Sequence, residues 1–400
     1  EIKLTKEKAD EILKTQEQMA SQALRVLGFA YSKDDKNYVF VGLMGMIDPP
    51  REGVKESIFS CKKAGIRTIM ITGDYGITAK AIAKEIGIEG DVITGDELDR
   101  LSSKQLANIV DRISIFARVS PQDKVKILES LKHKNHIVAM TGDGVNDAVA
   151  LKKSDVGVAV GSGTDVAKEA SDIILLDDNF VSIANAVKEG RGIYNNIKKF
   201  IGYLFSCNLT EVLVIFISLL IGLPLPLIAI QILWMNLLTD GLPALALGVD
   251  KVDEEVMNKP PRDPKHRIIT KKDLFFLLSQ STVMTLLVLG LFVFYLKKST
   301  VDITYLQTIA FSSLVLLELF NSFNYHSGSY SLFKKGIFSN KYLVGANLAS
   351  FLLQLVVVYV LIDLFRTAPL VLIDWIFIVS AGFIFIIVQE TIKLFVKPDY

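Results

Sequence analysis

The stretch HIVAMTGDGVNDA (residues 136–148) joins a short apolar run to a glycine-rich turn with two aspartates and one asparagine. An apolar, β-branched run bounded by turn residues predicts a buried strand. Asp143, Asn146 and Asp147 would then lie on a tight turn at the carboxyl end of that strand. Oxygen ligands on such a turn suit Mg²⁺, which usually takes one or two protein carboxylates together with phosphate. A polar loop that only caps the next helix is the alternative, and the density of the motif disfavours it.

Alternating segments surround this turn and predict the fold of residues 38–190. The strand-like segments are short, apolar and rich in β-branched residues, and they are 39–47, 67–72, 114–118, 136–142, 156–161 and 172–176. Helix-like segments lie between them, at 52–64, 77–87, 102–111, 121–134 and 146–153. This alternation indicates an α/β domain with a parallel sheet and helices on both faces. Ligands of such sheets bind beyond the carboxyl ends of the strands.

Two further candidates for phosphate binding fall at those strand ends. Thr72 and Gly73 follow the strand-like run RTIMI, where a hydroxyl and free backbone N–H groups can hold phosphoryl oxygens. Lys124 falls in the first turns of a helix that begins near Pro121, and its ammonium group can offset phosphate charge. Each signal is weak by itself, because Thr-Gly-Asp is a common turn and a single lysine is usually a solvated surface group.

The composition indicates a soluble part joined to a membrane part, because half of the residues are hydrophobic although 22% are charged. Apolar runs long enough to cross a bilayer as helices lie at about 198–221, 227–247, 274–296, 304–322, 342–363 and 371–395. Lysine and arginine concentrate in the loops 248–272 and 323–341. We therefore expect these loops, the soluble part and both ends of the membrane part to be cytosolic, at a cell membrane or an internal membrane. The net charge of +1 gives no basic signature for nucleic acid.

Three of the apolar runs carry carboxylate, amide or hydroxyl groups, which are costly inside a bilayer and usually functional there. These groups belong to Asn208, Glu211, Asn236, Thr239, Asp240, Glu318 and Asn321. Six to eight oxygen ligands are what Ca²⁺ prefers. No cluster of histidine or cysteine accompanies them, which argues against a soft metal, and the single thiol of Cys207 is expected on another face than Asn208 and Glu211. Hydrogen bonding that only joins the helices is the alternative.

The octapeptide TGDGVNDA (141–148) resembles the P-type ATPases, whose phosphorylation domain has the haloacid-dehalogenase-like fold. The resemblance extends in the family's order through MIDPPREGVKESI (46–58), AGIRTIMITGD (64–74) and FARVSPQDK (116–124). LWMNLLTDGLPALALG (233–248) resembles the membrane part of the calcium-transporting, sarcoplasmic-reticulum-type branch. The resemblance implies ATP-driven transport of Ca²⁺ out of the cytosol through an aspartyl-phosphate cycle, with Mg²⁺ as cofactor.

The resemblance also implies a role for each candidate residue. Thr72 and Gly73 would bind the transferred phosphoryl group, Lys124 would neutralise it, and Asn146 and Asp147 would organise the site around an Asp143-bound Mg²⁺. The nucleotide would be contacted by Arg25, Asp74 and Arg118. The Ca²⁺ ligands would be Asn208, Glu211, Asn236, Thr239, Asp240 and Glu318.

The Asp-Lys-Thr-Gly-Thr motif that this family phosphorylates does not occur in the 400 residues. By resemblance, residues 1–37 are the tail of a nucleotide-binding domain, 38–190 a phosphorylation domain without its first strand, and 191–400 a membrane domain. We expect this chain alone to be inactive, with the amino-terminal half on the same or a separate chain as its partner. A pump for Mn²⁺ or Na⁺, or a non-catalytic cation-binding half-pump, are the alternatives.

Overall fold

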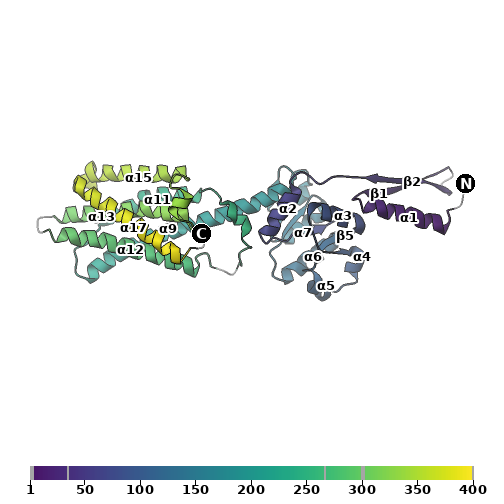
Figure 1. Cartoon of the computed structure of the whole chain (residues 1–400), viewed down its shortest axis with the longest axis horizontal. Coiled ribbons are helices and arrows are strands. Elements are labelled where there is room, and N and C mark those ends of the chain that lie inside the picture. Colours follow the sequence, from purple (N-terminus) through teal and green to yellow (C-terminus); the bar gives the residue numbers. More distant parts are fainter. Residues whose placement is uncertain (1–3, 34–35, 265–266, 299–301, 399–400) are drawn as a thin grey trace. The chain divides into compact units, whose positions relative to one another are not determined.

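The computed structural model describes residues 4–33, 36–264, 267–298 and 302–398. These residues form two compact units, one of Glu1–Lys188 with Glu254–Pro261, and one of Glu189–Asp253 with Arg262–Tyr400. The first unit holds all the strands of the described residues, and the second is helical (Figure 1).

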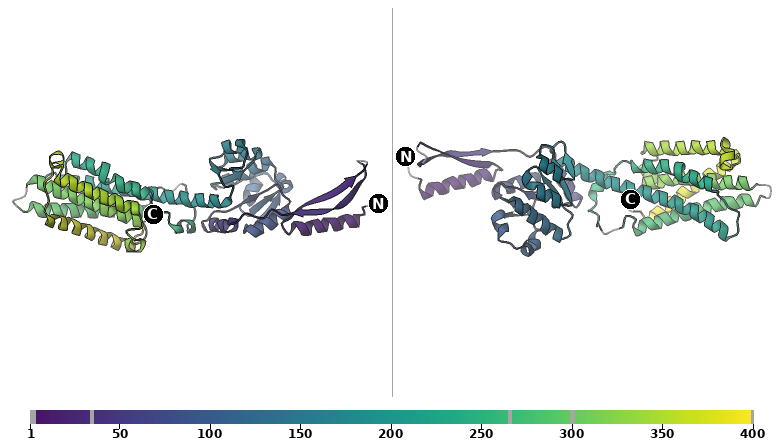
Figure 2. Two further views of the ribbon diagram at one scale, coloured as in Figure 1. Left: turned by 90° about the horizontal axis from the view of Figure 1, so that it is seen from above. Right: turned by 180° about the vertical axis from the view of Figure 1, so that it is seen from behind.

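The amino-terminal part of the first unit is a helix lying along a long β-hairpin (Figure 2). Helix α1 (Lys6–Ala20) precedes strands β1 (Arg25–Ser32) and β2 (Tyr38–Met46), which pair antiparallel with a bulge between Phe29 and Ala30. The sequence pattern had suggested residues 39–47 as a strand of the parallel sheet. The connection from β1 is too short for a parallel crossover, which needs a dozen or more residues, so the two strands pair as a hairpin.

The rest of the first unit contains six strands in two parallel sheets. Strands β3 (Met70–Ile71), β5 (Ile113–Ala117) and β4 (Asp91–Thr94) form one sheet in that order. Strands β6 (Ala139–Gly142), β7 (Val156–Val160) and β8 (Ile173–Leu175) form the other. Among the described residues, β3 and β6 each pair with a single neighbour, so each is an edge strand.

Helices cover both faces of the first parallel sheet, as the sequence predicts. Ile115 of β5 packs with buried alanines of α3 (Gly76–Ile86), whereas Phe116 packs with α5 (Ser103–Ile109) and α6 (Pro121–His133). The remaining helices of this unit are α2 (Val54–Lys63), α4 (Gly95–Asp99), η1 (Val145–Asp147), α7 (Ala148–Lys153), α8 (Asp165–Ala170) and η3 (Glu254–Asn258). The segment α4 with its preceding strand β4 was not apparent from the sequence pattern.

In the described residues, six helical segments are long and apolar enough to cross a membrane. They are α9 (Phe180–Leu220), the composite segment Ala229–Gly248, α12 (Lys271–Leu296), α13 (Ile303–Ser327), α15 (Lys341–Tyr359) and α17 (Leu372–Phe395). Their number and positions agree with the sequence, although α9 begins at Phe180 rather than near residue 198. Helix α13 is central and packs against α11 (Gly241–Gly248), α12, α15 and α17. Short helices α14 (Leu332–Lys335) and α16 (Ile362–Phe365) lie in the connections.

A buried ion cluster joins three of these helices at one end of the second unit. Asp250 Oδ2 accepts a hydrogen bond from Lys199 Nζ of α9 at 2.9 Å and lies 2.9 Å from His326 Nδ1 of α13. Asp250 Oδ1 accepts from Asn340 Nδ2, just before α15, at 3.2 Å. Burial by itself would raise the pKa of Asp250, but the bond to His326 and the charge of Lys199 together lower this pKa to about 2.

We expect Asp250→Asn to destabilise the second unit strongly, because it leaves the buried Lys199 ammonium without its ion-pair partner. Removal of one partner of a buried pair costs about 3–5 kcal/mol. The folded-state pKa lies below the unfolded value of about 3.9, so this contribution is complete above about pH 4 and is lost as the pH falls toward 2. Thermal unfolding of the detergent-solubilised chain measures both effects.

Asp253→Asn is the matched control, since Asp253 forms its 2.6 Å ion pair with Lys335 on a partly exposed surface. Such a pair contributes about 1 kcal/mol or less. Equal losses of stability in the two variants would contradict the role assigned to Asp250.

Candidate functional site

The turn after β3 is closed by its own side chains. Thr72 Oγ1 donates a hydrogen bond to Asp74 Oδ2 at 2.8 Å and accepts one from the Asp74 backbone N–H at 3.1 Å. The Thr72 N–H donates to Phe116 O at 2.9 Å, which extends the pairing with β5. Gly73 is exposed, and a Cβ added there would meet nothing within 4 Å. The space over Gly73 is therefore open to a ligand from solvent.

The turn after β6 is organised around the buried carboxylate of Asp147. Asp147 Oδ2 accepts hydrogen bonds from the backbone N–H groups of Asp143 and Gly144, both at 3.3 Å. Its other oxygen forms an ion pair with Lys124 of α6. Gly142 is required here, because a Cβ at this position would lie 2.5 Å from Asp147 Cβ. Asp147 thus fixes the turn, while the side chains of Asp143 and Asn146 are exposed and free to face a ligand.

The two turns lie at neighbouring strand ends, because Ile71 of β3 packs against the core cluster that contains Met140 of β6. Arg118 lies beside the turn after β3. Its backbone N–H donates to Asp74 O at 3.1 Å, and its guanidinium lies 5.0 Å from the centre of the Tyr75 ring. Arg25 is exposed at the start of β1, and the backbone oxygen of its neighbour Leu24 accepts a hydrogen bond from Thr78 Oγ1 of α3 at 3.3 Å. The structure therefore brings the predicted phosphate-handling residues to the carboxyl ends of two neighbouring strands, β3 and β6, which belong to different sheets.

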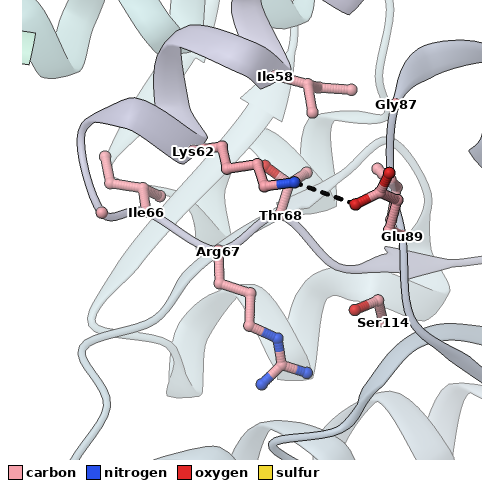
Figure 3. Close-up of a pocket in the computed structure, with 10 residues that line it drawn as sticks. Ile58, Lys62, Ile66, Arg67, Thr68, Gly87, Glu89 and Ser114 are labelled. Atoms are coloured by element: carbon pink, nitrogen blue, oxygen red, sulfur yellow. Dashed lines mark hydrogen bonds and ion pairs between the residues drawn. The ribbon is translucent and has the colours of Figure 1, made fainter.

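A surface pocket lies elsewhere on the same unit and is unrelated to these turns (Figure 3). Its lining includes Arg67 before β3 and Ser114 near the start of β5, so it lies toward the amino ends of these strands. The exposed ion pair between Lys62 and Glu89, 3.1 Å long, closes one side. In a parallel sheet the ligand-binding edge is the opposite one.

In the second unit, a thiol and two carboxylates meet in the interior. The sulfur of Cys207 on α9, a carboxylate oxygen of Asp240 and one of Glu318 on α13 all lie within 4.8 Å of one another. Both acidic residues are fully buried. Asp240 Oδ1 accepts a hydrogen bond from the Tyr203 hydroxyl at 3.2 Å. Asp240 Oδ2 and both Glu318 oxygens receive no hydrogen bond from a hydroxyl, amide or ammonium donor among the described residues.

An unpaired carboxylate in such a place is costly, and two of them side by side repel each other when ionised. A bound cation relieves both penalties. The arrangement is therefore suited to holding a cation between α13 and the composite helix.

Glu211 lies on the same buried face of α9 and is held by an amide. Asn236 Nδ2 donates to Glu211 Oε1 at 3.1 Å and to Oε2 at 2.9 Å. The amide oxygen of Asn236 is left for another partner. The hydroxyl of Thr239, also buried, donates to Met235 O at 3.1 Å. Glu211 is on the same helix as Cys207, and Asn236 and Thr239 directly precede Asp240 in the chain. These groups therefore lie next to the cluster.

A break in regular helix places Asn236, Thr239 and Asp240. Between α10 (Ala229–Trp234) and α11, residues Met235–Thr239 form a π-helical turn, in which the Asp240 N–H donates to Met235 O at 2.9 Å. Such turns are rare and frequent at functional sites. Pro243 has no N–H to give Thr239 O, which lies 3.5 Å from the Ser350 hydroxyl of α15 instead. The missing N–H of Pro243 thus lies just after the π turn, where regular helical bonding is interrupted.

Two residues of α9 differ from their expected positions. Asn208 is exposed and its amide donates to Leu204 O at 2.8 Å, so the structure does not bring it to the cluster. Cys207, expected on another face, lies in the cluster. Helical residues are rotated by about 100° each, so a residue four positions away is offset by about 40° and one three positions away by about 60°. Cys207 therefore shares a face with Glu211 more closely than Asn208 does.

Tyr203, whose hydroxyl donates to Asp240, was not predicted as a site residue from the sequence. The signal was present, because Tyr203, Cys207 and Glu211 follow one another at four-residue spacing. Asn321, by contrast, lies where expected near Glu318: its amide donates to Ser206 Oγ at 2.9 Å, and its oxygen has no partner in the described chain.

Comparison with known proteins places both units. Residues 224–395 match the family described as the carboxy terminus of cation-transporting ATPases. Residues 5–155, and separately 124–187, match haloacid-dehalogenase-like hydrolases.

Curated relatives match nearly the whole chain. It is 46% identical to calcium-transporting ATPase 1 of Bacillus cereus, over 98% of this chain and 47% of that protein. It is 45% identical to the calcium-transporting ATPase of Bacillus subtilis, over 90% of this chain and 42% of that protein. It is 41% identical to calcium-transporting ATPase type 2C member 1 of Homo sapiens, over 98% of this chain and 43% of that protein. The chain spans less than half the length of these relatives. With its haloacid-dehalogenase-like domain followed by membrane-spanning helices, it belongs to the cation-transporting ATPases.

Proposed function

We propose that the protein containing this chain is a P-type ATPase that uses ATP to transport Ca²⁺ out of the cytosol. The observation that carries the proposal is the pair of buried carboxylates, Asp240 and Glu318, of whose four oxygens only Asp240 Oδ1 accepts a hydrogen bond from a donor among the described residues. Glu211, Asn236 and Thr239 add further oxygen donors beside them. An oxygen-rich cluster of this kind suits a hard divalent cation. The relatives named as calcium-transporting ATPases support the same ion.

In this proposal the turns after β3 and β6 in the first unit bind phosphate. The exposed carboxylate of Asp143 holds Mg²⁺, and Asn146 lies beside it. Lys124, oriented by Asp147, neutralises charge on the transferred phosphoryl group. Thr72 and Gly73 receive its oxygens, and Asp74 with Arg118 contacts the nucleotide, toward which Arg25 also reaches. Positioning and charge neutralisation of this kind supply most of the catalysis in phosphoryl transfer.

The phosphorylated aspartate would come from outside this chain. Edge strands β3 and β6 each offer an unpaired edge at the two turns, and we propose that a strand from the amino-terminal half pairs there and brings the nucleophile to them. The basic loops between spans would keep this domain and both ends of the membrane part on the cytosolic side.

We expect the isolated chain to form no acid-stable phosphoenzyme from labelled ATP, and to form one when it is combined with the amino-terminal half. Gel autoradiography at acid pH measures the label. Lys124→Met in the combined protein should lower the label or its turnover by at least about tenfold, because phosphoryl charge then lacks its counter-ion. Label on the isolated chain would show that it carries its own nucleophile, against this proposal. No label in the combined protein would argue for a non-catalytic half-pump instead.

Glu318→Gln should preserve or raise the thermal stability of the chain in Ca²⁺-free solution, because it removes repulsion between two buried carboxylates. Ca²⁺ at about 100 times its Kd should stabilise the unchanged protein by about 2.7 kcal/mol and the variant far less. Differential scanning calorimetry with and without Ca²⁺ measures both changes.

The control is Glu390→Gln, which breaks a 2.9 Å ion pair with Lys393 away from the cluster. This variant should lose stability and keep its response to Ca²⁺. If Mn²⁺ or Na⁺ stabilises the unchanged protein and stimulates its ATPase activity while Ca²⁺ does neither, the pump carries that other ion.

A further inference from the structure

We propose that Cys207 is a metal ligand in the buried cluster that it forms with Asp240 and Glu318, and that its thiolate gives this cluster a second binding mode for soft divalent cations such as Cd²⁺ or Zn²⁺. The inference rests on the cation site of the proposed function. It names a further class of cation, one that oxygen donors alone do not select.

The geometry allows one ion to reach all three side chains. The Cys207 sulfur and one carboxylate oxygen each of Asp240 and Glu318 lie within 4.8 Å of one another. Ligand bonds to an ion of the size of Ca²⁺ are about 2.3–2.6 Å long, so two ligands on opposite sides lie up to about 5 Å apart. One ion of similar size, such as Cd²⁺, therefore fits between these atoms with small side-chain adjustments.

The carboxylates beside the thiol lack hydrogen-bond donors that would stabilise their charge. Both Glu318 oxygens and Asp240 Oδ2 are buried and have no hydrogen-bond partner in the described part of the chain. The thiol is itself fully buried. A buried cysteine by itself is usually a small apolar group, but here the unpartnered carboxylates approach the same point.

The chemistry of the ligands separates two kinds of ion. Ca²⁺ is held by oxygen and gains little from sulfur, whereas thiolate selects soft metals. On binding, the S–H bond of Cys207 breaks, a sulfur–metal bond forms, and the proton leaves to solvent. Soft cations would thus compete with Ca²⁺ at the same carboxylates while using one additional ligand.

The sequence makes the thiol easy to assign, because Cys61 is the only other cysteine in the 400 residues. Cys61 is buried on α2 of the first unit. Cys61→Ser is therefore the matched control, and it leaves Cys207 as the single thiol.

The test is titration of the full chain in nanodiscs with Cd²⁺, followed by the ultraviolet charge-transfer band of a cadmium–thiolate bond. We expect about one equivalent to bind in the unchanged and Cys61→Ser chains, with Ca²⁺ displacing it. In Cys207→Ser and Cys207→Ala the band should disappear, and the ratio of Cd²⁺ to Ca²⁺ affinity should fall at least about tenfold. In the Cys61→Ser chain, Cd²⁺ should also slow alkylation of Cys207, measured by mass spectrometry without any further variant.

A band that persists without Cys207, or no band and no protection in the Cys61→Ser chain, would overturn the inference. Ca²⁺-stimulated ATPase activity of the full-length protein is measured separately. Activity without the band leaves the proposed function standing and the thiol ligand refuted. The band without Ca²⁺-stimulated ATPase activity supports the thiol ligand and contradicts the proposed function.

Discussion

The burial of Asp240 and Glu318 side by side is the constraint on which the membrane unit depends. Isolated ionised carboxylates in a low-dielectric interior cost several kcal/mol each, and that cost falls with protonation, a counter-charge or hydrogen bonds. The protein supplies Asp240 with one hydrogen bond, from Tyr203, and supplies Glu318 with none among the described residues. A fold that keeps such a pair needs other interactions to hold its helices together, and it gains from a cation at the cluster.

Those other interactions lie at the two ends of the helices. At one end, Asp250 is surrounded by donors from α9 and α13. At the opposite end, Asp374 of α17 accepts hydrogen bonds from the hydroxyls of Tyr295 and Tyr305. Both carboxylates are satisfied, in contrast to the pair in the middle. Because the carboxylates at both ends are hydrogen-bonded, the bundle can stay assembled whether or not the central cluster holds an ion.

Much of the architecture follows from sequence pattern, because it depends on long periodic segments. The apolar runs predict the six spans, and the turn around Asp143 and Asp147 follows from its place after an apolar strand. Features set by rotation of a helix were harder to predict. A three-residue and a four-residue spacing both count as one face in a sequence pattern, yet the structure separates Asn208 from Glu211 and places Cys207 in the cluster. The pairing of β2 depended on a short connection rather than on composition.

The π turn explains why the composite helix contributes to the cluster at all. In a regular α-helix, Asn236 and Asp240 would lie about one turn apart with every backbone group bonded within the helix. The inserted residue of the π turn changes the rotation between them, so that Asn236 reaches Glu211 while Asp240 reaches Tyr203. Pro243 removes the N–H that would otherwise restore regular bonding at Thr239. A local cost in backbone hydrogen bonding is thus exchanged for two side chains directed at different partners.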